Sequence, residues 1–336
     1  MNKYLTILVL STINLGSTAS AVDENKYKEI MQSEVMPFYE SQATVGDIET
    51  PDATRLRYRV YEHPEAVVTV LLIQGWEEYA IRQAEMIYDL YQHKISIVTW
   101  DWRGQGDSQR LNDDPHVSYV SNYDEFVEDL ETIMTKVVKP RFTNEVVPIA
   151  HSMGGHILAR YVLKHPNHFN KIVLSSPGID PSSGGVPEWL IWFIAKVMEL
   201  LGMGQDFFPG QGPFDGTYSN YNTNSDQRYR TWFDFKMANR DMIQGGASAS
   251  FLRATLDSCW EVQKRLSELK MPILMLQGGK DLYVDAEGMN KLCEEATQCQ
   301  RVYFPEAMHE VLNEIDLYRD QALGAVVDFV LADTSP

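Results

Sequence analysis

The feature that most constrains the fold is the alternation of short apolar runs with longer segments of helical periodicity. The apolar runs cover residues 67–75, 95–108, 145–150, 171–178, 272–279 and 301–305. Helical spacing dominates residues 77–93, 123–138 and 310–332. This order predicts an α/β fold with a mostly parallel central sheet and helices on both faces. Catalytic groups in such sheets gather at the carboxyl ends of the strands.

One region interrupts the alternation. Residues 179–248 contain an apolar segment, then a loop rich in glycine, proline and asparagine with many aromatic residues. A segment of this length inside a compact domain is typically a functional insertion such as a lid. We therefore expect a core built from residues 22–178 and 249–336, with residues 179–248 forming a lid or cap.

The first residues read as a targeting segment. One lysine precedes an apolar stretch over residues 4–15, and small residues follow at Ala19 and Ala21. This predicts a secretory signal peptide, residues 1–21, cleaved after Ala21, and an exported protein, periplasmic or secreted. A buried first helix or a membrane anchor is the alternative. The apolar stretch is short for a membrane span.

Net charge and cysteine content limit the partners and the cofactors that the protein can have. The formal net charge of −18 argues against nucleic acid as a partner and against strong electrostatic attachment to anionic lipid. Export permits disulfides, so Cys293 and Cys299 are expected to pair, with Cys259 as a buried small hydrophobe. Since no cluster of histidine or cysteine has ligand spacing along the chain, we expect no metal and no cofactor.

The stretch from Glu145 to Val162 carries the strongest chemical signal. An apolar run ends in Ala150-His151, then Ser152 precedes Met153-Gly154, and helical spacing follows. A sharp strand-to-helix turn with small neighbours projects a serine hydroxyl outward, as in a nucleophile elbow. A helix cap is the alternative role for such a serine.

A serine nucleophile needs a base and an acid, which follow it along the chain in this arrangement. Asp281 comes just after the apolar run 272–279, whereas the competing Asp285 stands where a helix would begin. His309 is the last histidine in the chain. We predict a catalytic triad of Ser152, His309 and Asp281.

An oxyanion requires two hydrogen-bond donors. We assign one to the backbone amide of Met153 and the other to that of Trp76, in the loop after residues 67–75. His151 adjoins the nucleophile but faces the wrong side of the turn for proton transfer. It is expected to pack or to form hydrogen bonds near the pocket.

These motifs together resemble the lysophospholipase L2 and monoacylglycerol lipase branch of the α/β-hydrolase family. The segments that carry the resemblance are DWRGQGDSQR (101–110), IAHSMGGHI (149–157) and SDQRYRTW (225–232), within a region of likeness spanning residues 53–332. The resemblance implies ester hydrolysis through an acyl-enzyme. One departure is that the family's oxyanion loop begins His-Gly, where this chain has Gln74-Gly75-Trp76.

The insertion suggests the substrate class. Residues 189–204 form an apolar amphipathic helix with few basic residues. Trp189, Trp192 and Phe193 are the expected substrate-binding residues, with transient contact to a membrane surface through the lid. Simple packing of this helix on the core is the alternative. We expect a small lipid-like ester as substrate, such as a lysophospholipid or monoacylglycerol.

Two other functions stay open. An acyltransferase would use the same acyl-enzyme with an alcohol acceptor, and a non-catalytic binding protein would keep only the fold. An epoxide or haloalkane hydrolase is disfavoured because it needs an acidic nucleophile, and position 152 is serine. A peptidase of this fold usually needs an acid pair for the substrate amine, which the sequence does not reveal.

Overall fold

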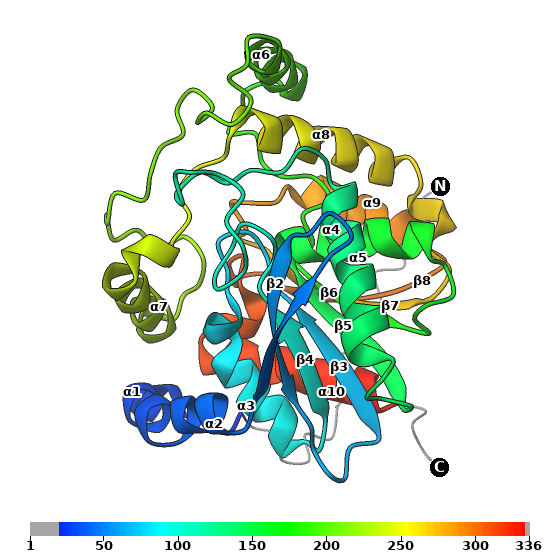
Figure 1. The fold of residues 1–336 in the computed structure, drawn as a ribbon. Helices are drawn as coiled ribbons and strands as arrows, with labels where there is room; N and C mark the ends of the chain where they lie inside the picture. The colour runs from blue at the N-terminus through cyan, green and yellow to red at the C-terminus, as the bar shows by residue number, and fades with distance from the viewer. Residues whose placement is uncertain (1–19, 333–336) are drawn as a thin grey trace.

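The computed structural model of the protein describes residues 20–332, and its centre is one eight-stranded sheet (Figure 1). The strand order is β1-β2-β4-β3-β5-β6-β7-β8. Strands β3 to β8 run parallel to one another, while β1 and β2 are antiparallel. The strands are β1 (Thr44–Glu49), β2 (Arg55–Tyr61), β3 (Val68–Ile73), β4 (Ser96–Trp100), β5 (Glu145–His151), β6 (Ile172–Ser175), β7 (Pro272–Gly278) and β8 (Gln298–Phe304). The predicted mostly parallel sheet is confirmed.

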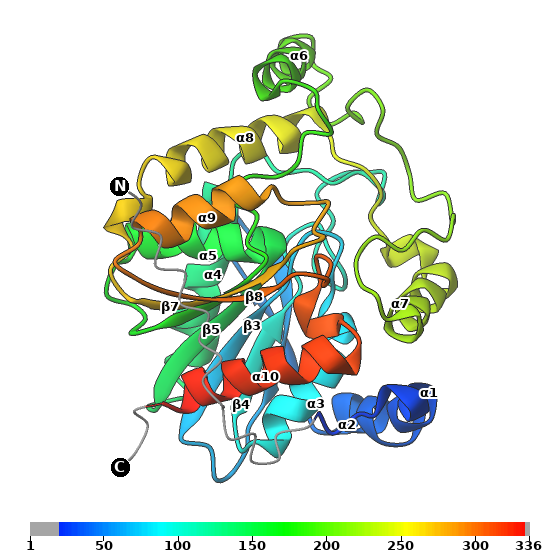
Figure 2. The same cartoon turned by 180° about the vertical axis from the view of Figure 1, so that it is seen from behind.

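Helices cover both faces of this sheet, as predicted (Figures 1 and 2). One face carries α4, α5, α8 and α9, and the other carries α3 and α10 with the N-terminal helices nearby. The helices are α1 (Tyr27–Ile30), α2 (Met36–Ser41), α3 (Ala84–Gln92), α4 (Asp124–Ile133), α5 (Ser152–Lys164), α6 (Glu188–Leu200), α7 (Asp226–Ala238), α8 (Ala249–Gln263), α9 (Ala286–Glu295) and α10 (Asp316–Leu331). None of the helices within residues 20–332 is long and apolar enough to cross a membrane.

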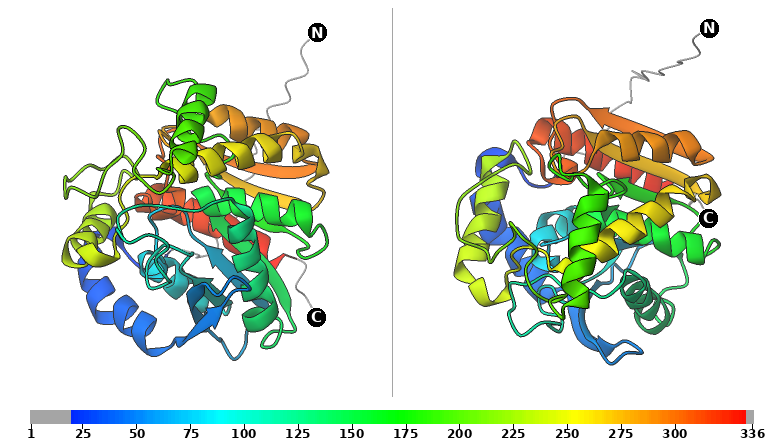
Figure 3. Two further views of the ribbon diagram at one scale, coloured as in Figure 1. Left: turned by 45° about the horizontal axis from the view of Figure 1, so that its top comes forward. Right: turned by 90° about the horizontal axis from the view of Figure 1, so that it is seen from above.

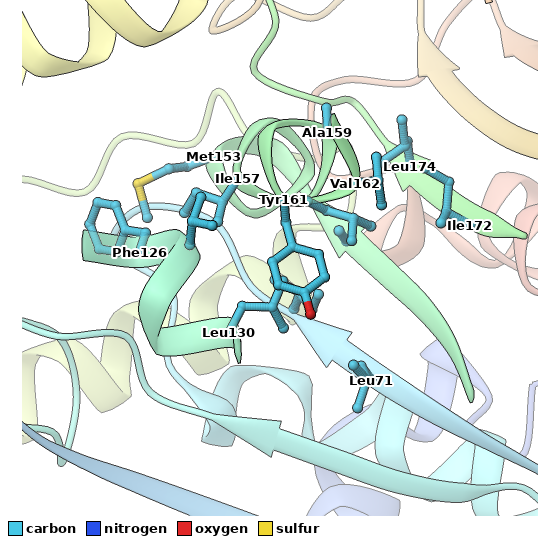
Figure 4. Close-up of a cluster of buried hydrophobic side chains, with 14 of the residues drawn as sticks. Leu71, Phe126, Leu130, Met153, Ile157, Ala159, Tyr161, Val162, Ile172 and Leu174 are labelled. Atoms are coloured by element: carbon cyan, nitrogen blue, oxygen red, sulfur yellow. The ribbon is translucent and has the colours of Figure 1, made fainter. Parts of the chain in front are cut away.

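Two apolar cores hold the layers together. On the α5 face, Ile157 and Tyr161 pack between the sheet and Phe126 and Leu130 of α4 (Figure 4). Strand β3 is buried on both faces, which explains its continuous aliphatic run. Edge strand β1 has no buried residue, so its sequence lacks the apolar runs that marked β3 to β8. That is why the sequence analysis did not predict it.

The insertion lies between β6 and α8 and contains α6 and α7 (Figure 3). Helix α6 rests on α8 through Ala195 and Met198. Helix α7 is anchored differently, because the buried guanidinium of Arg228 pairs with Glu85 of α3 at 2.9 Å. The two helices of the insertion are therefore attached to different parts of the core.

The cysteines occupy the predicted states. Cys293 of α9 and Cys299 of β8 form a disulfide, while Cys259 is free and buried. The predicted signal peptide falls almost wholly on residues 1–19, which lie outside the described residues. Just beyond it, Val22 is already buried in the core.

Candidate active site

Ser152 stands at the junction of β5 and α5, with a backbone φ of 50°. That left-handed conformation is rare for a serine, and it belongs to a sharp turn. The helix approaches the sheet closely, since a Cβ at Gly154 would lie 2.5 Å from the carbonyl oxygen of Gln74. A Cβ at Gly155 would lie 2.8 Å from Cβ of Pro177. The glycines after the serine are therefore required by packing.

His309 and Asp281 meet at the carboxyl ends of β8 and β7. Nδ1 of His309 lies 2.7 Å from Oδ2 of Asp281, and the two side chains are only 5% and 3% exposed. Oδ1 of Asp281 accepts hydrogen bonds from the amides of Tyr283 and Val284. Burial alone would raise the pKa of Asp281, but the hydrogen bond and charge of His309, together with the two amides, lower it. Asp281 is thus held as a carboxylate.

The competing acid, Asp285, lies elsewhere. It occupies the N-cap position of α9 and is exposed, although its side chain accepts no capping hydrogen bond. The geometry therefore favours Asp281 as the partner of His309.

The loop that carries His309 packs against the nucleophile elbow. The imidazole rings of His151 and His309 are 4.7 Å apart, and Nε2 of His151 lies 3.4 Å from the carbonyl oxygen of His309. Within residues 20–332, the hydroxyl of Ser152 forms no hydrogen bond. Catalytic hydrogen bonds are commonly long before substrate binds. The fold thus brings Ser152, His309 and Asp281 to one rim of the sheet.

The loop after β3 lies directly over the serine. A Cβ at Gly75 would stand 3.0 Å from Cβ of Ser152, so a side chain here would crowd the serine. The Met153 amide belongs to the first turn of α5, where amides lack an intrahelical acceptor. The Trp76 side chain is held by a 2.7 Å hydrogen bond to Ser118 and by packing on Phe251. The Met153 amide thus directly follows the serine, and Trp76 directly follows the close approach at Gly75. Their role as oxyanion donors stays a prediction.

A buried ion pair, which the sequence analysis did not predict, adjoins the triad. Nδ1 of His151 lies 3.0 Å from Glu78, whose Oε2 also accepts the Gly75 amide at 2.7 Å. Burial favours a neutral His151, but the charge and hydrogen bond of Glu78 outweigh it and raise the pKa of His151 to about 9. Burial likewise opposes the charge of Glu78, and His151 overcomes it, lowering the pKa of Glu78. The pair is therefore ionised at neutral pH.

A second buried pair connects this site to the insertion. Arg82 forms an ion pair with Glu310, the residue after His309, and both side chains are almost fully buried. Glu310 also accepts a 2.7 Å hydrogen bond from the side chain of Asn222, within the insertion. One sequence signal could have pointed to these buried pairs. Three charged residues, Glu77, Glu78 and Arg82, follow closely on the apolar run of a buried strand. Their partners are distant in sequence, so only the fold could identify them.

Two of the three predicted substrate-binding residues face solvent. Trp189 and Phe193 are 65% and 55% exposed on the outer face of α6. Trp192 instead donates a 2.8 Å hydrogen bond to Asp257 of α8. This placement arises because α6 packs on α8 through Ala195 and Met198, which leaves Trp189 and Phe193 facing outward. The alternative of packing on the core thus holds for one face of α6.

Comparisons with known proteins identify the family of this chain. The Hydrolase_4 family, described as serine aminopeptidase, S33, matches residues 63–316. Lysophospholipase L2 of Escherichia coli K12 is 28% identical over 295 residues, covering 84% of each chain. Monoacylglycerol lipase of Mycolicibacterium smegmatis is 25% identical over 275 residues, covering 80% of this chain and 87% of the relative.

The fold also has relatives among solved structures. A soluble variant of monoglyceride lipase from Saccharomyces cerevisiae, in complex with a substrate analog, superposes with a TM-score of 0.68. The two sequences are 18% identical, and the match covers 86% of this chain and 95% of the yeast chain. This likeness confirms the α/β-hydrolase fold.

Proposed function

This chain belongs to the Hydrolase_4 family of serine hydrolases, and from that premise we propose that it cleaves lipid-like carboxylic esters, lysophospholipids or monoacylglycerols, through an acyl-enzyme on Ser152. The observation that carries the proposal is the buried His309–Asp281 pair beside a serine held at a φ of 50°. Relatives that match most of this chain are a lysophospholipase and a monoacylglycerol lipase. Both names refer to a lipid substrate with a single acyl chain.

The geometry assigns each group a step. The hydroxyl of Ser152 attacks the ester carbonyl while His309 takes its proton, and the amides of Met153 and Trp76 stabilise the oxyanion. Collapse of the tetrahedral intermediate expels the alcohol, which receives that proton from His309. Water then attacks the acyl-enzyme, giving up a proton to His309, and release of the fatty acid returns the proton to Ser152. Asp281 stabilises the imidazolium in both halves of the reaction.

The insertion supports contact with a lipid surface. Trp189, Phe193, Leu200 and Leu201 project from α6 and its end, with exposures of 65%, 55%, 78% and 71%. An exposed apolar stripe on a short helix is typical of interfacial contact. Because the net charge is −18, apolar burial rather than attraction to anionic lipid would provide the binding energy.

The activity is tested by comparing wild type with Ser152→Ala on a monoacylglycerol, a lysophospholipid, a soluble short-chain ester and an aminoacyl amide. We expect ester hydrolysis by the wild type only, with labelling of Ser152 by a fluorophosphonate. Equal ester cleavage by the variant would refute the nucleophile. Preference for the amide would favour the aminopeptidase in the family's description. Transfer product exceeding free fatty acid, with added alcohol, would indicate an acyltransferase.

The lipid-surface contact needs a separate test. In sedimentation with phosphatidylcholine vesicles, we expect the double variant Trp189→Ser, Phe193→Ser to bind less than wild type. Its hydrolysis of the soluble ester should be unchanged, since α6 packs on α8 and both replaced side chains face solvent. Tyr303→Ser is the matched control, because Tyr303 is a 51% exposed aromatic residue on β8. If the double variant and Tyr303→Ser lost vesicle binding equally, a specific role of α6 would be refuted.

We also propose that the protein is exported and cleaved after Ala21. Val22 would then be the first residue of the mature chain, and it is only 1% exposed. N-terminal sequencing of the protein from fractionated cells tests this proposal. A retained Met1 in the functional protein would contradict it.

A further inference from the structure

Glu131 of α4 meets His165 and His168, which follow α5, on the surface of the molecule. One ligand atom from each residue lies within 4.8 Å of the others. Helix α5 has 13 residues, so the cluster is roughly 20 Å from Ser152, at the opposite end of the helix. We propose that these three residues bind a first-row transition-metal ion, Zn²⁺ in particular, at a site independent of the proposed ester hydrolysis.

Tyr161 already holds two of the three ligands together. Its hydroxyl donates to Oε2 of Glu131 at 2.5 Å and lies 2.7 Å from Nδ1 of His168. A hydroxyl has one proton, so when it goes to Glu131, Nδ1–H of His168 must donate to the hydroxyl oxygen. The other ring nitrogen then carries the free lone pair. A histidine whose second nitrogen donates to a neighbouring group is the usual arrangement of a metal ligand.

His165 is oriented by ring packing. Its imidazole stacks on Tyr161 with centroids 4.6 Å apart, and on His168 with centroids 4.8 Å apart. Each pair of planes differs by 30°. Hydrogen bonding between Tyr161, Glu131 and His168 does not explain why a second imidazole joins the cluster, whereas metal binding does.

Glu131 supplies the negative charge that would attract a cation, although the charge of Lys139 also acts on His168. Within residues 20–332, Glu131 forms no ion pair with a lysine or arginine, and the nearby Lys164 is engaged with Asp124 at 2.6 Å. Two imidazoles and one carboxylate suit zinc, with water in the remaining position, whereas calcium and magnesium prefer an all-oxygen shell. The ion would connect α4 to the segment after α5. We therefore expect a stabilising role.

The test is calorimetric titration of Zn²⁺ into the full mature chain, prepared without a histidine tag and dialysed against chelator. We expect one equivalent to bind. His165→Ala and His168→Ala should each weaken binding at least about tenfold, the usual cost of disturbing a metal's ligand arrangement. His93→Ala, at the end of α3, is the matched control and should bind as wild type. His309→Ala should also retain the site, which excludes zinc binding at the triad.

Thermal unfolding provides the second readout. Zinc should raise the melting temperature of wild type and His93→Ala but not of His168→Ala. Melting curves measured with chelator establish that every variant is folded. Failure of wild type to bind zinc, or binding by His165→Ala and His168→Ala as tight as that of wild type, would overturn the proposal. Ester hydrolysis is expected to be the same with and without zinc. If the protein proved not to hydrolyse esters, the zinc-binding result would therefore still stand.

Discussion

Replacing Glu78 by glutamine tests how the buried ion pair supports the site. The change removes one charge while keeping the side-chain size and an oxygen that can accept the Gly75 amide. His151 then loses the partner 3.0 Å away that keeps its imidazole protonated. Because burial disfavours the charged ring, we expect its pKa to fall below the ordinary value of 6.5.

The pKa values give the magnitude and the sign. Each tenfold change in protonation equilibrium is worth about 1.4 kcal/mol. Raising the pKa of His151 from 6.5 to about 9 therefore corresponds to about 3 kcal/mol of folding stability. This agrees with the roughly 3–5 kcal/mol lost when one partner of a buried pair is removed. Since the folded-state pKa is raised, the stabilisation is complete below pH 6.5 and disappears as the pH rises through about 9.

Urea unfolding of both proteins across this pH range is the assay. We expect Glu78→Gln to be less stable by about 3 kcal/mol between pH 4.5 and 6.5, with the difference shrinking as the pH rises from 6.5 to about 9. Glu77→Gln is the matched control, because Glu77 pairs with Lys236 at a more exposed position. Its effect should stay below about 1 kcal/mol. A stability difference that does not change with pH would refute the assignment of a charged His151.

Three further predictions concern the triad and the packing around it. Asp281→Asn should lower kcat for ester hydrolysis by about 10⁴ without unfolding the protein, because His309 loses the carboxylate that fixes its tautomer; steady-state kinetics and circular dichroism check this. Gly154→Ala should cost about 1–3 kcal/mol in urea unfolding, since the new methyl would stand 2.5 Å from a backbone oxygen of Gln74. A stability equal to wild type would show that α5 can shift. Reducing the Cys293–Cys299 disulfide, which closes a short loop with a sequence separation of 6, should lower the unfolding free energy by about 2 kcal/mol.

Much of the architecture could be predicted from local patterns. Buried parallel strands such as β3 and β7 require continuous apolar runs, and a strand-serine-helix turn requires small residues beside Ser152. The order of Ser152, Asp281 and His309 then placed each at the end of a strand. By contrast, α3 begins only at Ala84, after a 3₁₀ turn over Ala80–Gln83, although helical spacing extends further upstream. Periodicity alone does not distinguish these two kinds of helix.

The outer face of α6 shows a different limit. An apolar amphipathic helix predicts burial of one stripe, and the sequence analysis assigned its aromatic residues to substrate. The structure buries Ala195 and Met198 against α8 and leaves Trp189 and Phe193 in solvent. Which stripe is buried depends on the shape of the neighbouring helix, which the sequence of α6 does not contain.

The sequence by itself determined the features that depend on neighbours along the chain. These are the strand-helix alternation, the serine turn and the close Cys293–Cys299 pair. Only the tertiary structure decided that Glu78 charges His151, that Glu310 pairs with Arg82 and accepts a hydrogen bond from Asn222 of the insertion, and that Glu131 lies beside His168. The physical reason is that ion pairs and ligand clusters depend on distance and burial in space. Partners separated by dozens of residues satisfy those conditions only after the sheet and its helices have packed.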